Sequence, residues 1–578
     1  MSPAVPYEKR MPRAPNGPMM SGDIRERSVG REALAAVFVA TVLALGARLW
    51  ALGWRMAHWD EGRVAFRVLE YVRTGAYQYD SVVHGPFLFQ MNRRLFELFG
   101  PTDFVMRLPV ALVGAFLPLA ALLFRERLRD AEVGCLAFLL AANPVLLYYS
   151  RFMRSDVLVA GFAFVALGFA VRAFDTGKAR YTLAAAVSLA LATTTKEFIV
   201  VDLVAWGCAL ALLLDRRLLL ARTGSGVGDR FYAVLDWLFG GARRQGKAVA
   251  GAAVAFLLVF VLFYAPRPDL WNALGNPASL PDVVGAATVG SWNEFTSMWV
   301  SGGQQSHPYL PYLMDYLNVV VAGALPLTAF ALLGFVADRY GGERDVVAFA
   351  FYWGVLAGLV YPLATDITPA PWGVVHMAVP LAVPAAVGLG LVVRRGRAAL
   401  AADDRAGVAL AAVVLLLVGG QIGATAVSTS FTHAQDNHEL VQFGQPDDDM
   451  KPAFATAERA IDSENPDVDV MFYGEHFRQW SYRLPLPWYF SAMNATTGYT
   501  ADLDAMVELG DGPPPVVLAR ERHAGNLSAA LEGYRKMGPY AITLDVPGNV
   551  VRVVVFVEES EADANNTARQ VNPHWLRS

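Results

Sequence analysis

Residues 33–61 read ALAAVFVATVLALGARLWALGWRMAHWDE, an apolar run of membrane-spanning length that leads into two adjacent carboxylates. About 20 apolar residues suffice for a helix to cross the hydrocarbon core of a bilayer. The run is too long for the apolar core of a signal peptide, and no small-residue cleavage site follows it. We therefore expect an uncleaved signal anchor, with Asp60 and Glu61 just outside the hydrocarbon.

Further apolar runs of similar length follow along the chain. They lie near 104–124, 131–149, 156–174, 180–195, 197–219, 247–266, 313–337, 346–364, 370–393 and 406–428. Hydrophobic residues make up 55% of the 578 residues, more than is usual for a soluble protein. The sequence thus predicts a polytopic α-helical membrane protein with about 11 transmembrane helices within residues 33–428.

Basic clusters indicate the orientation of these helices. Residues 1–32 contain six basic side chains among several prolines and glycines, which predicts a disordered cytoplasmic arm. The even-numbered spans end mostly in basic clusters too, such as Arg394-Arg395-Gly396-Arg397. Because positive loops stay in the cytoplasm, the N-terminus is expected inside the cell membrane and the C-terminus outside.

Two long loops are then expected on the outer side. Residues 55–103 contain apolar side chains at helical spacing in 59–74 and 86–99, with charged residues between them. This pattern is typical of helices that lie at the membrane interface. A second outer loop covers residues 267–312.

The last segment, residues 429–578, is acidic, with 22 acidic against 11 basic residues. Strand-like runs occur at 468–473, 515–519 and 550–556, and a helical pattern lies near 522–536. This alternation predicts a small extracytoplasmic α/β domain. It contains no glycine-rich phosphate loop or nucleophile elbow, and nothing in the sequence indicates a nucleic-acid partner.

Charged and aromatic residues collect at the outer ends of several different spans. Ionisable groups at membrane depth are costly, so they usually face a protein interior or a wet cavity. The candidate site residues are Asp60, Glu61, His84, Arg151, Arg154, Asp156, Lys196, Glu197, Trp372 and His376. The alternative is that they are interfacial anchors and helix caps. The tight turns at 150–156 and 195–197 favour a site, because a plain connector needs no charge there.

The types of these residues point to group transfer from a phosphorylated lipid. Asp60 and Glu61 could act as catalytic carboxylates that take a proton from an acceptor hydroxyl, or hold a divalent cation such as magnesium or manganese. Arg151, Arg154 and Lys196 could neutralise a lipid phosphate at headgroup depth. The other candidates, which would complete the substrate-binding surface, are His84, Asp156, Glu197, Trp372 and His376.

These motifs together resemble the GT-C glycosyltransferase superfamily, with the protein O-mannosyltransferases and the lipid A aminoarabinose transferases as similar families. A narrower resemblance is to the flippase activity-associated proteins of halophilic archaeal glycosylation. It rests on His58 to Glu61, His84-Gly85-Pro86, Arg151 to Asp156, Thr195-Lys196-Glu197, Pro371-Trp372 to His376, and Pro485-Leu486-Pro487-Trp488-Tyr489. The resemblance covers about residues 33 to 556.

The resemblance implies a GT-C-like fold and a membrane glycosyltransferase that uses a polyprenyl (dolichyl) phosphate sugar as donor. Asp60 matches the first-loop carboxylate that serves as base or metal-linked group in the superfamily, and Glu61 is its partner. The acceptor would be a lipid-linked glycan or a glycoprotein on the extracytoplasmic face. The last domain shows no β-trefoil-like repeat of the mannosyltransferase kind, which leaves the acceptor open.

Two other functions are compatible with the sequence. A transport component would help lipid-linked sugar to cross the bilayer without making bonds, as the name of the narrower family implies. A binding or assembly protein would use its last domain to recognise a surface glycoprotein. Asp60 and Glu61 distinguish the first alternative from a transferase, because only a transferase needs a carboxylate there.

Overall fold

The computed structural model describes residues 30–220, 246–302, 307–365, 367, 369–432, 438–461, 468–509, 512–543 and 550–559. The arm predicted at residues 1–32 lies outside the described residues except for its last three positions.

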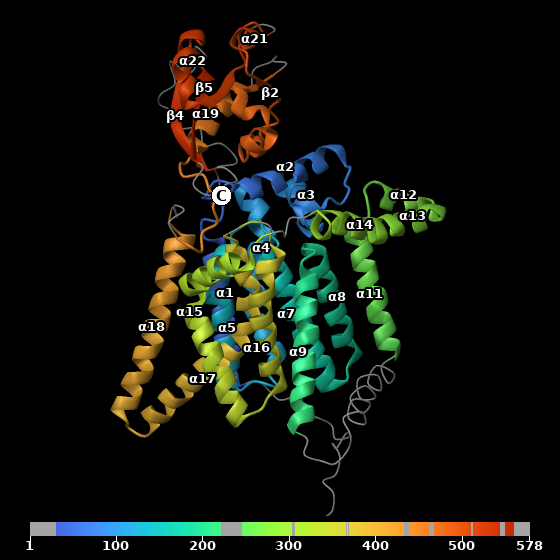
Figure 1. Ribbon diagram of the computed structural model, residues 1–578, viewed down its shortest axis with the longest axis vertical. Coiled ribbons are helices and arrows are strands. Elements are labelled where there is room, and N and C mark those ends of the chain that lie inside the picture. Colours follow the sequence, from blue (N-terminus) through green and yellow to red (C-terminus); the bar gives the residue numbers. More distant parts are fainter. Residues whose placement is uncertain are drawn as a thin grey trace, which may run out of the picture.

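A helix occurs at each of the predicted spans, and these helices form one bundle (Figure 1). They are α1 (Arg31–Leu49), α4 (Asp103–Phe116) with η2 (Leu117–Phe124), α5 (Asp130–Ala142) with α6 (Pro144–Ser150), α7 (Asp156–Thr176), α8 (Ala179–Thr195), α9 (Ile199–Leu220), α11 (Gly246–Tyr264), α15 (Tyr309–Gly341), α16 (Asp345–Ala364), η6 (Pro371–Gly373) with α17 (Val374–Ala401), and α18 (Arg405–Ser430).

Within the described residues, eight of these helices are long and apolar enough to cross a membrane, or nine if α5 and α6 form one bent span. The chain is therefore a multi-pass membrane protein. The number of about 11 stays a prediction, because α8 has only 17 residues and α9 ends in Asp215-Arg216-Arg217 before its last three leucines.

The run predicted as one span at 131–149 is broken in the middle. Helices α5 and α6 meet at Asn143 with a bend of 49°. Pro144 causes the break, because it has no N–H and forces the residue before it out of the helical region. Asn143 accordingly has φ −55° and ψ 126°, and its side chain accepts a hydrogen bond from the Leu146 backbone N–H.

The first predicted outer loop contains two helices, α2 (Trp59–Thr74) and α3 (Phe87–Phe99), close to the predicted ranges. Helix α2 begins with a capping box: His58 accepts from the Asp60 N–H, and the Glu61 carboxylate accepts from the His58 N–H. It ends at Gly75, whose φ of 68° suits glycine. Both helices lie across the end of the bundle (Figure 1).

The second predicted loop is also helical rather than extended. It contains α12 (Asp269–Gly275), η3 (Pro277–Ser279), α13 (Leu280–Gly285), η4 (Ala286–Gly290), α14 (Ser291–Phe295) and η5 (Thr296–Val300). These short helices project sideways from the end of α11 (Figure 1). They expose large apolar side chains such as Trp271, Leu274 and Trp292, which is typical of interfacial helices.

The described residues from 450 to 559 form a small domain, here called the tail domain, above the bundle (Figure 1). Its strands are β1 (Val470–Tyr473), β2 (Thr497–Thr500), β3 (Val516–Arg520), β4 (Tyr534–Thr543) and β5 (Val550–Glu558), in the order β2-β1-β3-β5-β4. β1 pairs in parallel with β2 and β3, and β5 pairs antiparallel with β3 and β4. Its helices are α19 (Lys451–Ile461), α20 (Leu486–Ala492), α21 (Leu503–Val507) and α22 (Ala524–Ala530), with the 3-10 turns η7 (Glu475–Arg478), η8 (Trp480–Arg483) and η9 (Glu521–His523).

One local prediction in this domain is wrong. The helical pattern near 522–536 continues only to Ala530, and Tyr534 to Lys536 belong to β4. Gly533, with φ 83°, reverses the chain between them. Pairing with the apolar strand β5 then outweighs the local helical pattern, because it satisfies the backbone groups of Tyr534 to Thr543.

Buried polar contacts hold the tail domain to the bundle. Asp103, at the start of α4, accepts hydrogen bonds from Trp488 Nε1 and Tyr489 OH of α20, each at 3.1 Å. Lys451 Nζ of α19 lies 3.0 Å from the same carboxylate. The Ala57 N–H donates to Tyr489 OH at 2.7 Å. The tail domain is thus in contact with the chain just before the start of α2.

Candidate functional site

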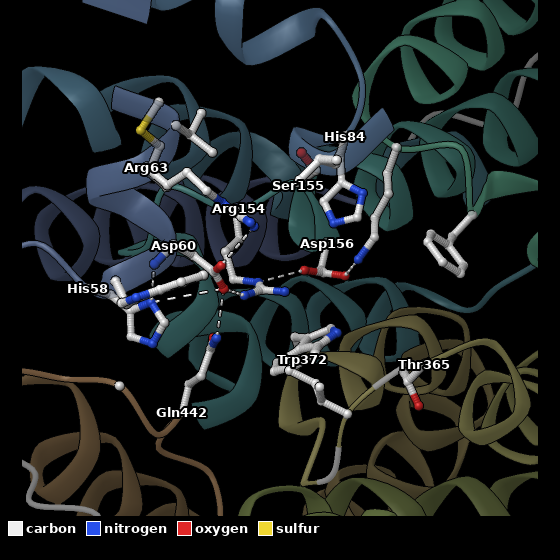
Figure 2. A pocket seen from close by; sticks show the side chains of 18 of the residues that line it. His58, Asp60, Arg63, His84, Arg154, Ser155, Asp156, Thr365, Trp372 and Gln442 are labelled. Carbon is white, nitrogen blue, oxygen red and sulfur yellow. Dashed lines mark hydrogen bonds and ion pairs between the residues drawn. The ribbon is translucent and has the colours of Figure 1, made fainter. Parts of the chain in front are cut away.

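A cavity of about 310 Å³ lies where the bundle end, the first outer helices and the chain before the tail domain meet. Six of the residues predicted from the sequence line it: Asp60, His84, Arg154, Asp156, Lys196 and Trp372. They come from α2, from the loops before α3 and α7, from the start of α7, from the end of α8 and from η6, and Figure 2 shows most of them pointing toward one another.

Asp60 occupies the first turn of α2, and 22% of its side chain is exposed. Its Oδ2 accepts from Arg154 at 2.5 Å and from Gln442 Nε2 at 3.1 Å, and its Oδ1 accepts from Arg63 at 3.2 Å. Burial by itself would raise the pKa of Asp60. Arg154, and after it Arg63, outweigh that effect and hold the pKa of this carboxyl well below its usual range. Asp60 is therefore a carboxylate at any physiological pH.

Arg154 connects the two carboxylates of the cavity. Besides Asp60, its Nε donates to Asp156 Oδ2 at 3.3 Å, and its guanidinium lies 4.1 Å from the centre of the Trp372 ring. Such stacking suits arginine, whose planar charge is weakly hydrated. Lys196 Nζ donates to Asp156 Oδ1 at 2.8 Å. Asp60, Arg154, Asp156 and Lys196 thus form a row of alternating charge (Figure 2).

His376 lies behind this row and is fully buried. Its Nε2 is 3.3 Å from Asp156 Oδ1, and its Nδ1 is 3.2 Å from Asp202 Oδ2. Tyr361 OH and Trp353 Nε1 also donate to Asp202, each at 3.0 Å. His376 therefore supports Asp156 from the protein interior instead of facing the cavity.

His84 faces the cavity from the loop before α3. Its ring stacks on Trp299 at 5.7 Å, and its Nδ1 lies 3.5 Å from Glu197 Oε2. Burial, and then the charge of Lys196, lower the pKa of His84, which keeps the imidazole neutral. Glu197 does not line the cavity; it backs His84 and accepts from Tyr79 OH at 2.5 Å.

Gly85 explains how the His84 loop reaches this position. A Cβ on Gly85 would lie 2.4 Å from the Thr194 carbonyl oxygen. Only glycine lets the loop approach the end of α8 this closely. The His84-Gly85-Pro86 and Thr195-Lys196-Glu197 motifs are therefore in direct contact.

Besides Glu197 and His376, two more of the predicted residues lie away from the cavity. Glu61 is fully buried and accepts from Arg107 Nε and NH2, each at 2.8 Å, and from the Met153 N–H at 2.7 Å. Arg151 donates to the carbonyl oxygens of Ala47, Arg48 and Trp50 at 2.7–3.0 Å. Glu61 thus ties α2 to α4 and to the 151–155 turn, and Arg151 caps the end of α1.

The residues present do not fit a divalent cation shared by Asp60 and Glu61. The two carboxylates point to different surroundings, and the oxygens of Asp60 already face two guanidinium groups. Among the described residues, no three His, Cys, Asp or Glu side chains form a group that could hold a metal ion.

Several residues of the site were not identified from the sequence. Arg63 and Gln442 contact Asp60, and Asp202 contacts His376. Asp202 is a single charged residue near the start of an apolar run, and this feature of the sequence could have identified it as a site residue. Nothing in the sequence distinguishes Gln442 as a site residue, because a neutral amide in a connecting segment is usually an ordinary surface residue.

Comparison with known families supports both parts of the resemblance. Residues 83–227 match the model of the dolichyl-phosphate-mannose-protein mannosyltransferases, and residues 450–558 match that of the Agl23 flippase-associated protein C-terminal domain. The resemblance read from the sequence motifs is therefore confirmed. No curated protein sequence gives a significant match.

Solved structures with the same fold include two membrane proteins. ArnT from Cupriavidus metallidurans bound to undecaprenyl phosphate is 18% identical, with a TM-score of 0.54 over 91% of this chain and 98% of that one. The archaeal oligosaccharyltransferase AglB from Archaeoglobus fulgidus, in complex with an inhibitory peptide and a dolichol-phosphate, is 14% identical, with a TM-score of 0.50 over 90% of this chain and 76% of that one. The fold is GT-C-like, as the resemblance implied.

Proposed function

From a GT-C-like fold and a cavity that combines two carboxylates with three cationic side chains, we propose that this protein is a membrane glycosyltransferase. It moves a sugar from a polyprenyl (dolichyl) phosphate donor to a lipid-linked glycan or a protein, in protein glycosylation. The observation that carries the proposal is Asp60, which faces the cavity as a carboxylate 2.5 Å from Arg154. The two similar structures hold undecaprenyl phosphate and dolichol-phosphate, which supports this class of donor.

The row of charges can supply a general base and phosphate-binding cations for such a reaction. An acceptor hydroxyl beside Asp60 attacks the anomeric carbon of the donor sugar, and a new C–O bond forms. The bond between that carbon and the phosphate oxygen breaks, and the polyprenyl phosphate leaves with the electron pair. The proton of the acceptor hydroxyl passes to Asp60, which acts as the general base.

Arg154 and Lys196 are the cations that would bind the phosphate. Both are held close to the cavity by Asp156, so little conformational entropy is lost when the phosphate binds. A phosphate that engages Arg154 also draws it away from Asp60. Since Arg154 is the strongest of the charges that lower the pKa of Asp60, donor binding makes Asp60 a better base.

The site is proposed to face the outside of the cell membrane, with the N-terminus in the cytoplasm. The basic clusters between the spans support this orientation. The proposed domains are the arm 1–32, the transmembrane domain 33–428 and the extracytoplasmic segment 429–578 that contains the tail domain.

Transfer by the purified protein tests the proposal. Wild-type protein with a radiolabelled dolichyl-phosphate sugar and a panel of glycolipid and peptide acceptors should form labelled product. Asp60→Asn keeps the shape of the side chain but cannot take the proton, so turnover should fall by roughly a hundredfold or more. Asp80→Asn is the matched control, because Asp80 lies in the same loop and pairs with Arg67 outside the cavity.

A second function has one observation in its favour. The tail domain matches the Agl23 flippase-associated protein C-terminal domain, so the chain could instead assist the flipping of dolichyl-phosphate-linked sugar. The two functions differ at Asp60. If cells whose single copy is Asp60→Asn make surface glycan of normal composition and amount, the transport function replaces the transferase function.

A further inference from the structure

The chain between α18 and the tail domain forms part of the cavity wall. Residues 438–446, here called the linker, contribute Gln442, Phe443 and Gly444 to the lining. His58 Nε2 lies 2.5 Å from the Phe443 carbonyl oxygen, and the Trp59 N–H donates to the Gly444 carbonyl oxygen at 3.3 Å. Gly444 has φ 84°, and a Cβ there would meet His58 Nε2 at 2.9 Å. The linker is thus fitted closely to the first turn of α2.

Gln442 is oriented by its contact with Asp60. Its side-chain Nε2 donates to Asp60 Oδ2 at 3.1 Å, and the residue is 1% exposed (Figure 2). A carboxylate only accepts hydrogen bonds, so the amide nitrogen and not the amide oxygen must face Asp60. The position of the other amide atom, Oε1, follows from this contact.

Gln442 Oε1 has no hydrogen-bond partner among the described residues, although it is buried. A buried acceptor without a donor destabilises the protein, and such atoms in native proteins usually indicate a missing partner. Gln442 lines the cavity next to Asp60, but Oε1 itself is buried, so the side chain must shift slightly before a donor group on a bound substrate can supply this partner. That substrate is the acceptor, since Asp60 receives the acceptor's proton.

We propose that Gln442 recognises the acceptor, and that the acceptor is a sugar with a second hydroxyl next to the one that is glycosylated. This inference rests on the proposed transferase function. The reacting hydroxyl has one proton, which goes to Asp60, so it cannot also donate to Gln442. The hydrogen bond to Oε1 must therefore come from another donor on the same acceptor.

Adjacent hydroxyls on a sugar ring provide such a pair of donors, one for Asp60 and one for Gln442. The side chain of serine or threonine carries a single hydroxyl. The site is therefore matched to a glycan acceptor, on a lipid or on a glycoprotein, rather than to an unmodified serine or threonine.

The test uses the full-length protein in detergent, a radiolabelled dolichyl-phosphate sugar and octyl glycosides as acceptors. Each acceptor that works is compared with its monodeoxy analogues, which lack one hydroxyl next to the reacting position. Gln442→Met keeps the length of the side chain without its polar atoms. Gln445→Met is the control, because Gln445 lies on the same linker and contacts Arg55 and Tyr148 outside the cavity.

One deoxy analogue should have a KM about tenfold higher than its parent with the wild-type protein, the usual effect of leaving a buried acceptor unpaired. Gln442→Met should raise the KM of the parent acceptor by a similar factor and leave the KM of the donor unchanged. The two losses should not add, so Gln442→Met uses parent and analogue equally well. Loss of kcat with every acceptor is expected too, because Gln442 also holds Asp60.

Gln445→Met should retain the wild-type preference between parent and analogue. Losses that multiply in Gln442→Met, or a wild-type protein that prefers serine or threonine peptides to glycosides, would overturn the assignment of Gln442 and leave the transferase function intact. If the wild-type protein transfers sugar to no acceptor, the proposed function itself fails and this inference fails with it.

Discussion

The charged side chains of the site are held in place by one another. Arg154 lies between Asp60 and Asp156, and Lys196 contacts Asp156 from the other side. A charge removed from water is tolerated when an opposite charge and hydrogen bonds compensate it. The cations proposed to bind phosphate are therefore already paired in a largely buried cavity, and an arriving phosphate would only replace one anionic partner with another.

Arg63 provides a test of how Asp60 is kept ionised. It contacts Asp60 at 3.2 Å and, after Arg154, does most to lower the pKa of that carboxyl. Arg63→Leu should let the pKa of Asp60 rise, so more of the free enzyme carries a protonated Asp60 at low pH. The acid limb of the pH profile of kcat/KM for the acceptor should then move to higher pH.

Arg67→Leu is the control for this experiment, because Arg67 lies one turn further along α2 and pairs with Asp80. The acid limb of the kcat/KM profile of Arg67→Leu should coincide with that of the wild-type protein. An Arg63→Leu profile that coincides with the wild-type profile would mean that Asp60 is not the group that limits activity at low pH.

The sequence predicts which residues gather at this end of the bundle, but not how deeply each side chain is buried. The alternation of loops along the chain predicts that Asp60, Arg154 and Lys196 lie at one end of the bundle, since the loops that hold them alternate with basic loops at the other end. Glu61 is adjacent to Asp60 in sequence, yet it is buried against Arg107, because consecutive residues on a helix point about 100° apart. Their catalytic and binding roles stay predictions.

Helices α20 and α4 are joined by a buried polar contact. Asp103 accepts from two donors of α20 and faces Lys451, all within a buried interface. No periodic pattern in the sequence indicates this contact, because it joins segments that are far apart along the chain. The break at Asn143-Pro144 could have been predicted, since proline disfavours a helical residue before it.

Replacing Asp103 tests whether this contact holds the tail domain. Asp103→Asn leaves one acceptor oxygen for two donors and removes the charge opposite Lys451, at a cost of about 3–5 kcal/mol for breaking a buried pair. We expect faster hydrogen exchange in α20 and in the linker 438–446, measured by mass spectrometry, with the transmembrane helices unchanged. Asp504→Asn, at an exposed site in α21, should leave exchange in both segments as in the wild type. Unchanged exchange in Asp103→Asn would show that apolar packing alone holds the tail domain.

For the whole molecule, the orientation in the membrane is the property that gives the site its access to substrates. In a background that lacks both native cysteines (Cys135→Ala and Cys208→Ala), single cysteines at Arg478 and Gly290 should react with an impermeant maleimide on intact cells, and one at Tyr340 should not. All three positions are exposed at the ends of the bundle or in the tail domain. Labelling of the Tyr340→Cys variant in intact cells would mean that the orientation is the reverse of the predicted one, with the cavity on the cytoplasmic side.

The linker also determines when the protein can first work. Gln442, Phe443 and Gly444 lie beyond α18, and the α20 residues that anchor the tail domain come later still. The ribosome therefore delivers every transmembrane helix before it delivers the last wall of the cavity. We expect a chain that is still being synthesised to have an incomplete cavity, so the proposed transferase activity should begin only after the tail domain has folded.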